Sequence, residues 1–131
     1  MALRKNTSMV NAQATASTDL FNGGTLQIRT GAQPASANDA ATGTLLCTIT
    51  LPADAFGSPT NGVIPKLGTW SGTAVADGTA GWARFISSAN DRRMDVSVGE
   101  AAADMIIDNA AILTNGVVTV TSFDFTTPLT A

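Results

Sequence analysis

Short segments that alternate between apolar and polar residues recur along most of this chain, and runs rich in Gly, Pro, Asn and Asp separate them. In the segment 45–51, Leu45, Cys47, Ile49 and Leu51 would point to one side of a strand. About seven or eight such segments follow one another, with no helical crossover pattern between them. Parallel strands normally need such a crossover. The pattern therefore predicts an all-β fold, an antiparallel β-sandwich or jelly roll of about 7–8 strands.

One pair of segments makes a prediction about strand pairing. Asp77 and Gly78 stand between the alternating stretches 69–76 and 81–87. An Asp-Gly pair between two alternating stretches is typical of a tight turn that joins antiparallel strands. We therefore expect these two stretches to form a β-hairpin.

The last long stretch, 117–125, makes a prediction about register. Its apolar residues fall into two sets that differ in phase, Val118 and Val120 in one set and Phe123 and Phe125 in the other. A β-bulge inserts one extra residue into a strand and thereby reverses the alternation beyond it. A bulge near 121–122 would place both sets on the same face of the sheet.

The segment from Asn6 to Phe21 is the one stretch with helical character. Thr7 or Ser8 could cap a helix there, and the sequence Asn-Gly-Gly at 22–24 would end it. Four apolar residues recur at helical spacing, namely Met9, Ala12, Ala16 and Leu20.

The composition of this segment leaves a second interpretation open. Its Thr and Ser residues are poor helix formers, so residues 1–20 could instead form an extended arm. In either case the chain divides into two parts, an N-terminal arm or short helix at 1–21 and a β-sandwich domain at 22–131.

The side chains that usually perform catalysis are nearly absent. The chain has no His, no Tyr, one Cys and a single Glu, Glu100. It therefore lacks the common groups for proton transfer, nucleophilic attack and transition-metal binding, and we expect neither an enzyme nor a cofactor or metal. The net charge of −3 argues against nucleic acid, which requires a basic face. The apolar runs are too short to cross a bilayer, so we expect no membrane partner.

Charged residues make up only 13% of the chain, about half the usual share. Such a surface suits a protein that packs permanently against copies of itself or against a partner, because a free monomer normally needs more charge for solubility. The N-terminal residues include no apolar leader, and the lone Cys47 cannot form an internal disulfide. We therefore expect the protein to be made and kept inside a cell.

Acidic residues gather in one part of the sequence, where Asp91, Asp95, Glu100, Asp104 and Asp108 lie within a short distance of one another. A calcium site needs several oxygen ligands from one neighbourhood, but the spacing here is not that of a calcium-binding loop. Solvated charges in turns explain this set better than a cation site does.

Trp70 and Trp82 flank the predicted hairpin in a chain with only 5% aromatic residues. They could fill the core, form a subunit contact, or provide a stacking platform for a sugar. We favour the core or a subunit contact. Together with Met9, Val10 and Phe21 of the N-terminal segment, they are the residues at which we expect contacts with a partner.

Several segments combine turn and strand residues in a distinctive way. They are 22–35 (NGGTLQIRTGAQPA), 41–46 (ATGTLL) with Leu51 and 55–57 (AFG), 78–85 (GTAGWARF) and the terminal stretch 116–125. Together these segments cover most of 22–125, and they resemble a family of small virion structural proteins of tailed bacteriophages. The motifs are patterns of turns and strands, and none is a catalytic signature.

The resemblance implies a structural protein of a bacteriophage virion, assembled in the host cytoplasm. We expect a head decoration or cement protein that stabilises the capsid shell as a homo-oligomer, with a trimer favoured. Its partners would be the major capsid protein or other virion proteins, and residues 1–20 would reach a neighbour. The alternatives are a tail-tip, baseplate or neck component of the same particle, and a carbohydrate-binding β-sandwich module.

Overall fold

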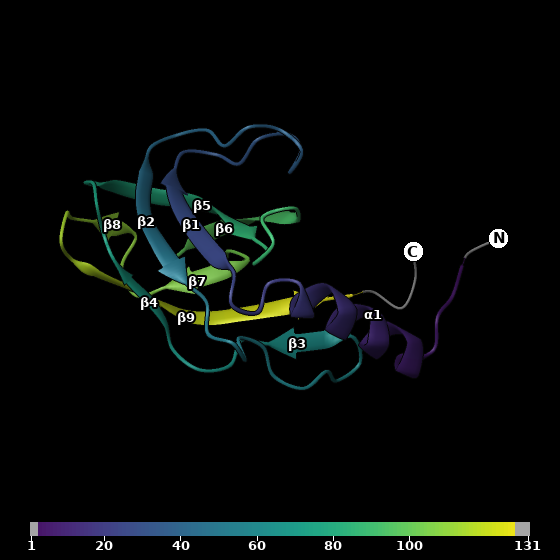
Figure 1. Ribbon diagram of the computed structural model, residues 1–131. Helices are drawn as coiled ribbons and strands as arrows, with labels where there is room; N and C mark the ends of the chain where they lie inside the picture. The colour runs from purple at the N-terminus through teal and green to yellow at the C-terminus, as the bar shows by residue number, and fades with distance from the viewer. Residues whose placement is uncertain (1–2, 128–131) are drawn as a thin grey trace.

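The computed structural model describes residues 3–127 and shows a mostly β protein with one N-terminal helix (Figure 1). The β-rich class predicted from the sequence is thereby confirmed, whereas residues 1–2 and 128–131 of the two predicted parts lie outside the described residues. The elements are α1 (Thr7–Asp19), β1 (Thr25–Thr30), β2 (Leu45–Thr50), β3 (Val63–Pro65), β4 (Trp70–Thr73), β5 (Gly78–Ile86), β6 (Arg93–Gly99), β7 (Met105–Ile107), β8 (Ala111–Ile112) and β9 (Val117–Thr126).

The strands form one mixed sheet that is strongly curled into a half-barrel (Figure 1). Its path runs β2-β1-β5-β6-β7-β9-β3, while β4 also pairs with β9 and β8 pairs with β5. The curl brings β4 back toward β2, because Cys47 and Ala74 form an isolated bridge and the Val75 amide donates to the Leu46 carbonyl over 2.8 Å. A single sheet that curls in this way encloses a core by itself, so the fold is not clearly the predicted two-layered sandwich.

One pair of strands corrects the prediction of a purely antiparallel sheet. β6 and β7 are parallel, although only the short segment 100–104 joins them. The Ser97 amide donates to the Asp104 carboxylate over 3.0 Å, and the Asp104 amide donates to Ser97 Oγ over 2.9 Å. Ala102 adopts a φ of 53°, a left-handed conformation that helps the chain to reverse twice in few residues. The chain can therefore move sideways by one strand without a helical crossover.

The predicted hairpin between 69–76 and 81–87 is wrong. β4 pairs with β9, whereas β5 pairs with β1 and β6, so the two stretches are not neighbours. Asp77 accounts for the difference, because its carboxylate accepts hydrogen bonds from the backbone amide of Thr114 over 2.7 Å and from the hydroxyl of Thr114 over 2.8 Å. The residue that is typical of a local turn instead ties the β4–β5 connection to the distant β8–β9 turn.

β9 contains the predicted bulge. Two successive residues of β7 lie opposite Ser122 and Val120, so Thr121 has no partner on β7. Because the extra residue reverses the alternation, Val120 and Phe123 are both buried although they differ in phase. The register predicted from the apolar pattern is confirmed.

The N-terminal segment is a helix and not an extended arm. Its N-cap is Asn6, in place of the predicted Thr7 or Ser8, and the Asn6 side chain accepts a hydrogen bond from the Met9 amide over 2.9 Å. An Asn side chain at this position satisfies a backbone donor that the first turn leaves free, which offsets the poor helix propensity of the Thr and Ser residues.

α1 packs against β3 and the end of β9 (Figure 1). Val10, Ala14 and Thr18 form its buried face, and the Thr18 hydroxyl donates to the Ala14 carbonyl over 3.1 Å, so burial leaves that hydroxyl satisfied. The Asn11 side chain accepts a hydrogen bond from the Gly62 amide over 2.8 Å. The helix is thus fixed to the half-barrel by both apolar and polar contacts.

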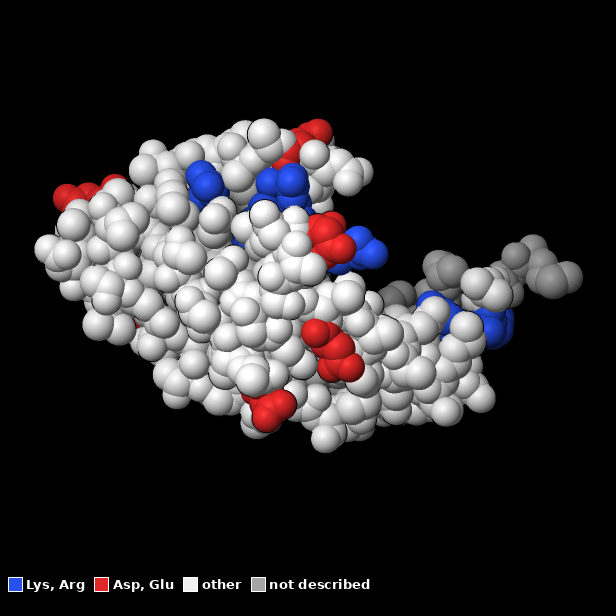
Figure 2. Space-filling model, in the orientation of Figure 1, with Lys and Arg blue, Asp and Glu red and all other residues white. Residues whose placement is uncertain are grey.

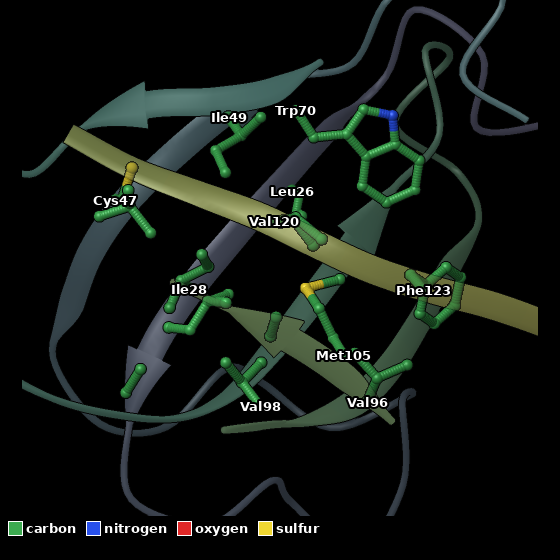
Figure 3. Packing of buried hydrophobic residues seen from close by; sticks show 14 of the residues in the cluster. Leu26, Ile28, Cys47, Ile49, Trp70, Val96, Val98, Met105, Val120 and Phe123 are labelled. Atoms are coloured by element: carbon green, nitrogen blue, oxygen red, sulfur yellow. The ribbon is translucent and has the colours of Figure 1, made fainter. Parts of the chain in front are cut away.

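The main core lies inside the curl of the sheet (Figure 3). Trp70 packs edge-on against Phe56 and Phe85, with ring centroids 5.3 Å and 5.8 Å apart. Such aromatic pairs contribute about 0.5–1.5 kcal/mol each beyond the burial of their area. The buried members of this cluster run in sequence from Phe21 to Phe123, so α1 lies outside it. Strands β1, β2, β6, β7 and β9 also contribute to this core, with Leu26, Ile28, Cys47, Ile49, Val96, Val98, Met105 and Val120.

Candidate interaction surfaces

The structure separates the five residues at which the sequence predicted partner contacts. Val10, Phe21, Trp70 and Trp82 are 0–4% exposed, whereas Met9 is 50% exposed. The four buried side chains pack within the chain itself, so only Met9 is available to a neighbour in this structure. Large apolar residues in a sequence this poor in bulk are needed first for the subunit's own interior.

The two tryptophans lie on opposite faces of the sheet. Ala83 and Phe85 belong to the main core, so the alternation along β5 places Trp82 and Arg84 on the outer face. Trp82 is nevertheless fully buried, and the Arg84 guanidinium lies 5.4 Å from the centroid of its ring. Because Trp70 is fully buried as well, neither indole offers an open face to a sugar. The carbohydrate-binding alternative therefore has no support from the tryptophans that suggested it.

A buried ion pair accompanies Trp82 on the outer face. Arg84 Nε lies 2.8 Å from Asp95 Oδ1 and Arg84 Nη2 lies 3.0 Å from Asp95 Oδ2, with the two side chains 4% and 5% exposed. The two residues face each other across β5 and β6. Hydrogen bonding to Asp95 raises the pKa of Arg84, and the nearby charge of Asp39 acts in the same direction. The bidentate geometry satisfies both charges within the chain and links β5 to β6.

The β1–β2 loop, residues 31–43, lies near Trp82, Arg84 and Asp95 on the outer face of the sheet. The Gly31 backbone lies directly against Gly81 of β5, and Asp39 lies near enough to act on Arg84. The sequence analysis did not predict the Arg84–Asp95 ion pair, although both residues occupy polar positions of alternating stretches. The missing information was that β5 and β6 pair in a register that places those two positions opposite each other.

The acidic residues noted in the sequence do not converge. Within residues 3–127, no group of three or more Asp, Glu, Cys or His residues is placed to hold a metal ion. Each carboxylate instead has local partners: Asp91 binds Ser87 and Arg92, Asp95 binds Arg84, Asp104 binds Ser97, and Asp108 binds the amides of Asn109 and Thr119. The residue left over, Glu100, is exposed.

Two further features are a surface hollow beside Arg92 and the buried thiol of Cys47. A hollow of about 350 Å³ is lined by Ala37, Asn38, Asp91, Arg92 and Arg93, and there Arg92 pairs with Asp91 over 3.1 Å in an exposed position. The Cys47 thiol lies in the core, where burial raises its pKa and so disfavours the reactive thiolate. In the described part of the chain, no helix has the length and apolar character to span a bilayer.

α1 presents an uncharged face to solvent, which we call the helix face. The stripe that the sequence predicted at helical spacing is the exposed side of α1, whereas the buried side consists of Val10, Ala14 and Thr18. Met9 is 50% exposed and Leu20 is 42% exposed. The small side chains between them would let another backbone approach closely. The members of the helix face are Met9, Ala12, Ala16 and Leu20.

A second apolar surface lies where the β8–β9 turn meets the end of β4, and we call it the barrel-end patch. It consists of Val75, Leu113 and Val117, which are 64%, 68% and 68% exposed. The backbone holds these residues together, because the Asn115 amide donates to the Ala74 carbonyl over 2.9 Å. A hollow of about 230 Å³ adjoins the patch, and Leu113 and Val117 line part of it.

The helix face and the barrel-end patch lie at opposite ends of the molecule. β9 runs from the barrel-end patch to the region of α1 and β3, a span of roughly 33 Å for its ten residues (Figure 1). Charged side chains are sparse over most of the face shown in Figure 2, as the composition requires. Comparisons with protein-family models, with curated proteins and with solved structures find no match to this chain.

Proposed function

We propose that this protein is a structural subunit of a tailed-phage virion, and that it decorates the head shell as a homo-oligomer, with a trimer favoured. The observation that carries the proposal is the presence of two exposed apolar surfaces, the helix face and the barrel-end patch, at opposite ends of one subunit. The likeness of its turn-and-strand segments to small virion proteins supports the same function.

Two separate surfaces allow one subunit to contact two neighbours at once. Contacts that are weak singly then add up across a symmetric assembly, because each later contact forms at a high effective concentration. A protein acting in this way needs a stable shape and few reactive groups. The buried ion pair, the aromatic core and the lack of His and Tyr all fit that requirement.

The same architecture would serve a tail-tip, baseplate or neck component, and this remains the alternative. The finer fold prediction, a sandwich or jelly roll, also stays a proposal, because the curled sheet does not clearly divide into two layers. The partner on the particle would be the major capsid protein or another virion protein, and assembly would take place in the host cytoplasm.

The number of copies in a purified particle tests the proposal. Quantitative mass spectrometry against the major capsid protein should give hundreds of copies for a shell decoration, whereas three to about twelve copies would indicate the neck or tail. Absence from purified particles would refute both locations. Deletion of residues 2–18 should leave the core cluster intact, because α1 lies outside it, and should abolish binding to shells in a pelleting assay.

A further inference from the structure

We propose that copies of this chain associate head to tail, with the helix face of one copy packed against the barrel-end patch of the next. The inference rests on the proposed function, in which the chain works as an oligomer, and it names the surfaces that form the contact. The partner of each surface is therefore a second copy of the same chain.

The apolar character of both surfaces supports this pairing. Single exposed apolar residues are normal on a protein, but groups of them mark contact sites. Met9 and Leu20 bracket the helix face, and Ala12 and Ala16 between them present little bulk. The barrel-end patch projects Leu113 and two valines beside a hollow of about 230 Å³. Ala12 and Ala16 therefore leave room between Met9 and Leu20 for the exposed side chains of the barrel-end patch.

The charges at the N-terminal end of the helix face are complementary to those around the barrel-end patch, while the exposed Asp19 borders the other end of the helix face. Arg4 and Lys5 immediately precede α1, whereas Asp77 and Asp108 flank the barrel-end patch. Figure 2 shows basic side chains beside the N-terminal end of the molecule and acidic ones at the opposite end, with charges of both signs between them. Within residues 3–127, the hydrogen bonds to both aspartates go to Oδ1, which leaves Oδ2 for a cation from a neighbouring copy. Opposite charges in these places would orient the two copies.

The location of the surfaces fixes the type of symmetry. A contact between two different patches is heterologous, so an open chain of copies keeps one unused helix face at one end and one unused barrel-end patch at the other until a ring closes. A standard interface takes roughly 800 Å² from each partner. Two such interfaces would use about a quarter of the 6829 Å² surface of this chain and leave the rest for contacts with a shell.

A mixing experiment tests this arrangement with the full-length protein. Ala16→Arg blocks the helix face and Leu113→Arg blocks the barrel-end patch, and both positions are exposed, so neither change disturbs the core. Light scattering coupled to gel filtration should show an oligomer for the wild type and a monomer for each variant. Ala101→Arg, an exposed alanine on neither surface, should keep the oligomer.

The decisive sample is the equimolar mixture of the two variants. Each variant retains the surface that the other lacks, so the mixture should form a one-to-one heterodimer that goes no further. Raising the salt concentration should weaken it, because the flanking charges are exposed. A mixture that stays monomeric, or a blocked variant that still assembles with itself, would overturn the inference.

The test of head-to-tail assembly can fail independently of the test of the proposed virion function. A wild-type protein that remains monomeric at about 1 mM, where even a millimolar Kd would produce association, refutes head-to-tail assembly. The copy number in purified particles would still decide whether the chain is a virion component. Conversely, head-to-tail assembly in solution together with absence from particles would refute the proposed function alone.

Discussion

Replacement of Asp95 by Leu tests how much the buried Arg84–Asp95 ion pair contributes to stability. Arg84 would keep its charge, because a guanidinium stays protonated at neutral pH even without a partner. It would lose hydrogen bonds of 2.8 Å and 3.0 Å while remaining buried. A hydrogen bond to a charged group contributes about 1.5–3 kcal/mol. We therefore predict that Asp95→Leu lowers the free energy of unfolding by about 3–5 kcal/mol, as expected for an uncompensated buried charge.

A double-mutant cycle separates the interaction energy between Arg84 and Asp95 from the effect of removing each residue alone. Arg84→Met alone should also be costly, because it leaves the Asp95 carboxylate buried without its cation. The double variant removes both charges and keeps apolar bulk beside Trp82. Its loss of stability should be at least ~2 kcal/mol smaller than the sum of the two single losses, since contacting residues are not additive.

Urea unfolding followed by tryptophan fluorescence measures these changes, because both indoles are buried and become solvated on unfolding. All samples should be compared at one protein concentration, since association raises apparent stability. Asp124→Leu, at an exposed position of another strand, is the matched control and should change stability by no more than about 0.5 kcal/mol. A loss below ~1 kcal/mol for Asp95→Leu, or additive losses in the cycle, would refute the reasoning.

Three further predictions concern a close backbone approach, a helix cap and a carboxylate that accepts hydrogen bonds from a distant turn. Gly81→Ala should prevent stable folding, because its Cβ would collide with the carbonyl oxygen of Gly31. Gly99→Ala is the control, since its Cβ has ordinary space and its melting temperature should be close to that of the wild type. Equal melting temperatures for the two variants would contradict this prediction. Asn6→Ala should remove the cap of α1 and cost about 1 kcal/mol in urea unfolding, and no change would mean that the cap is dispensable. Hydrogen bonds from the β8–β9 turn lower the pKa of Asp77 from its usual 3.8, so its contribution is present above that value and is lost as pH falls through the lowered pKa. The stability difference between wild type and Asp77→Ala should therefore shrink on acidification from about pH 5, and a constant difference would contradict it.

Local patterns predicted several features of this protein correctly. Alternation with a period of two is a property of the strand itself, so stretches such as 45–51 and 117–125 were recognisable without knowledge of their neighbours. The bulge at Thr121 was predictable for the same reason, since it records a change of phase within one strand. The helical spacing of 9–20 likewise identified a real stripe on a real helix.

Errors arose wherever a feature depends on distant residues. The Asp-Gly pair resembled a hairpin turn, but Asp77 binds Thr114, and no local signal could reveal that partner. The parallel pairing of β6 and β7 depends on reciprocal bonds between Ser97 and Asp104, which the usual rule for crossovers does not anticipate. The burial of Trp70 and of three other residues at which partner contacts were expected could not be predicted either, because burial depends on the complete fold.

The amino-acid sequence by itself determined the class of the molecule. Its alternation predicted a β-rich chain, and the absence of His and Tyr left few of the side chains that usually perform catalysis. The tertiary structure alone decided which strands pair, why Arg84 and Asp95 meet, and which side of α1 faces solvent. The physical reason is range: side-chain periodicity and backbone propensity act over a few residues, whereas burial and register are set by packing among segments far apart in the chain.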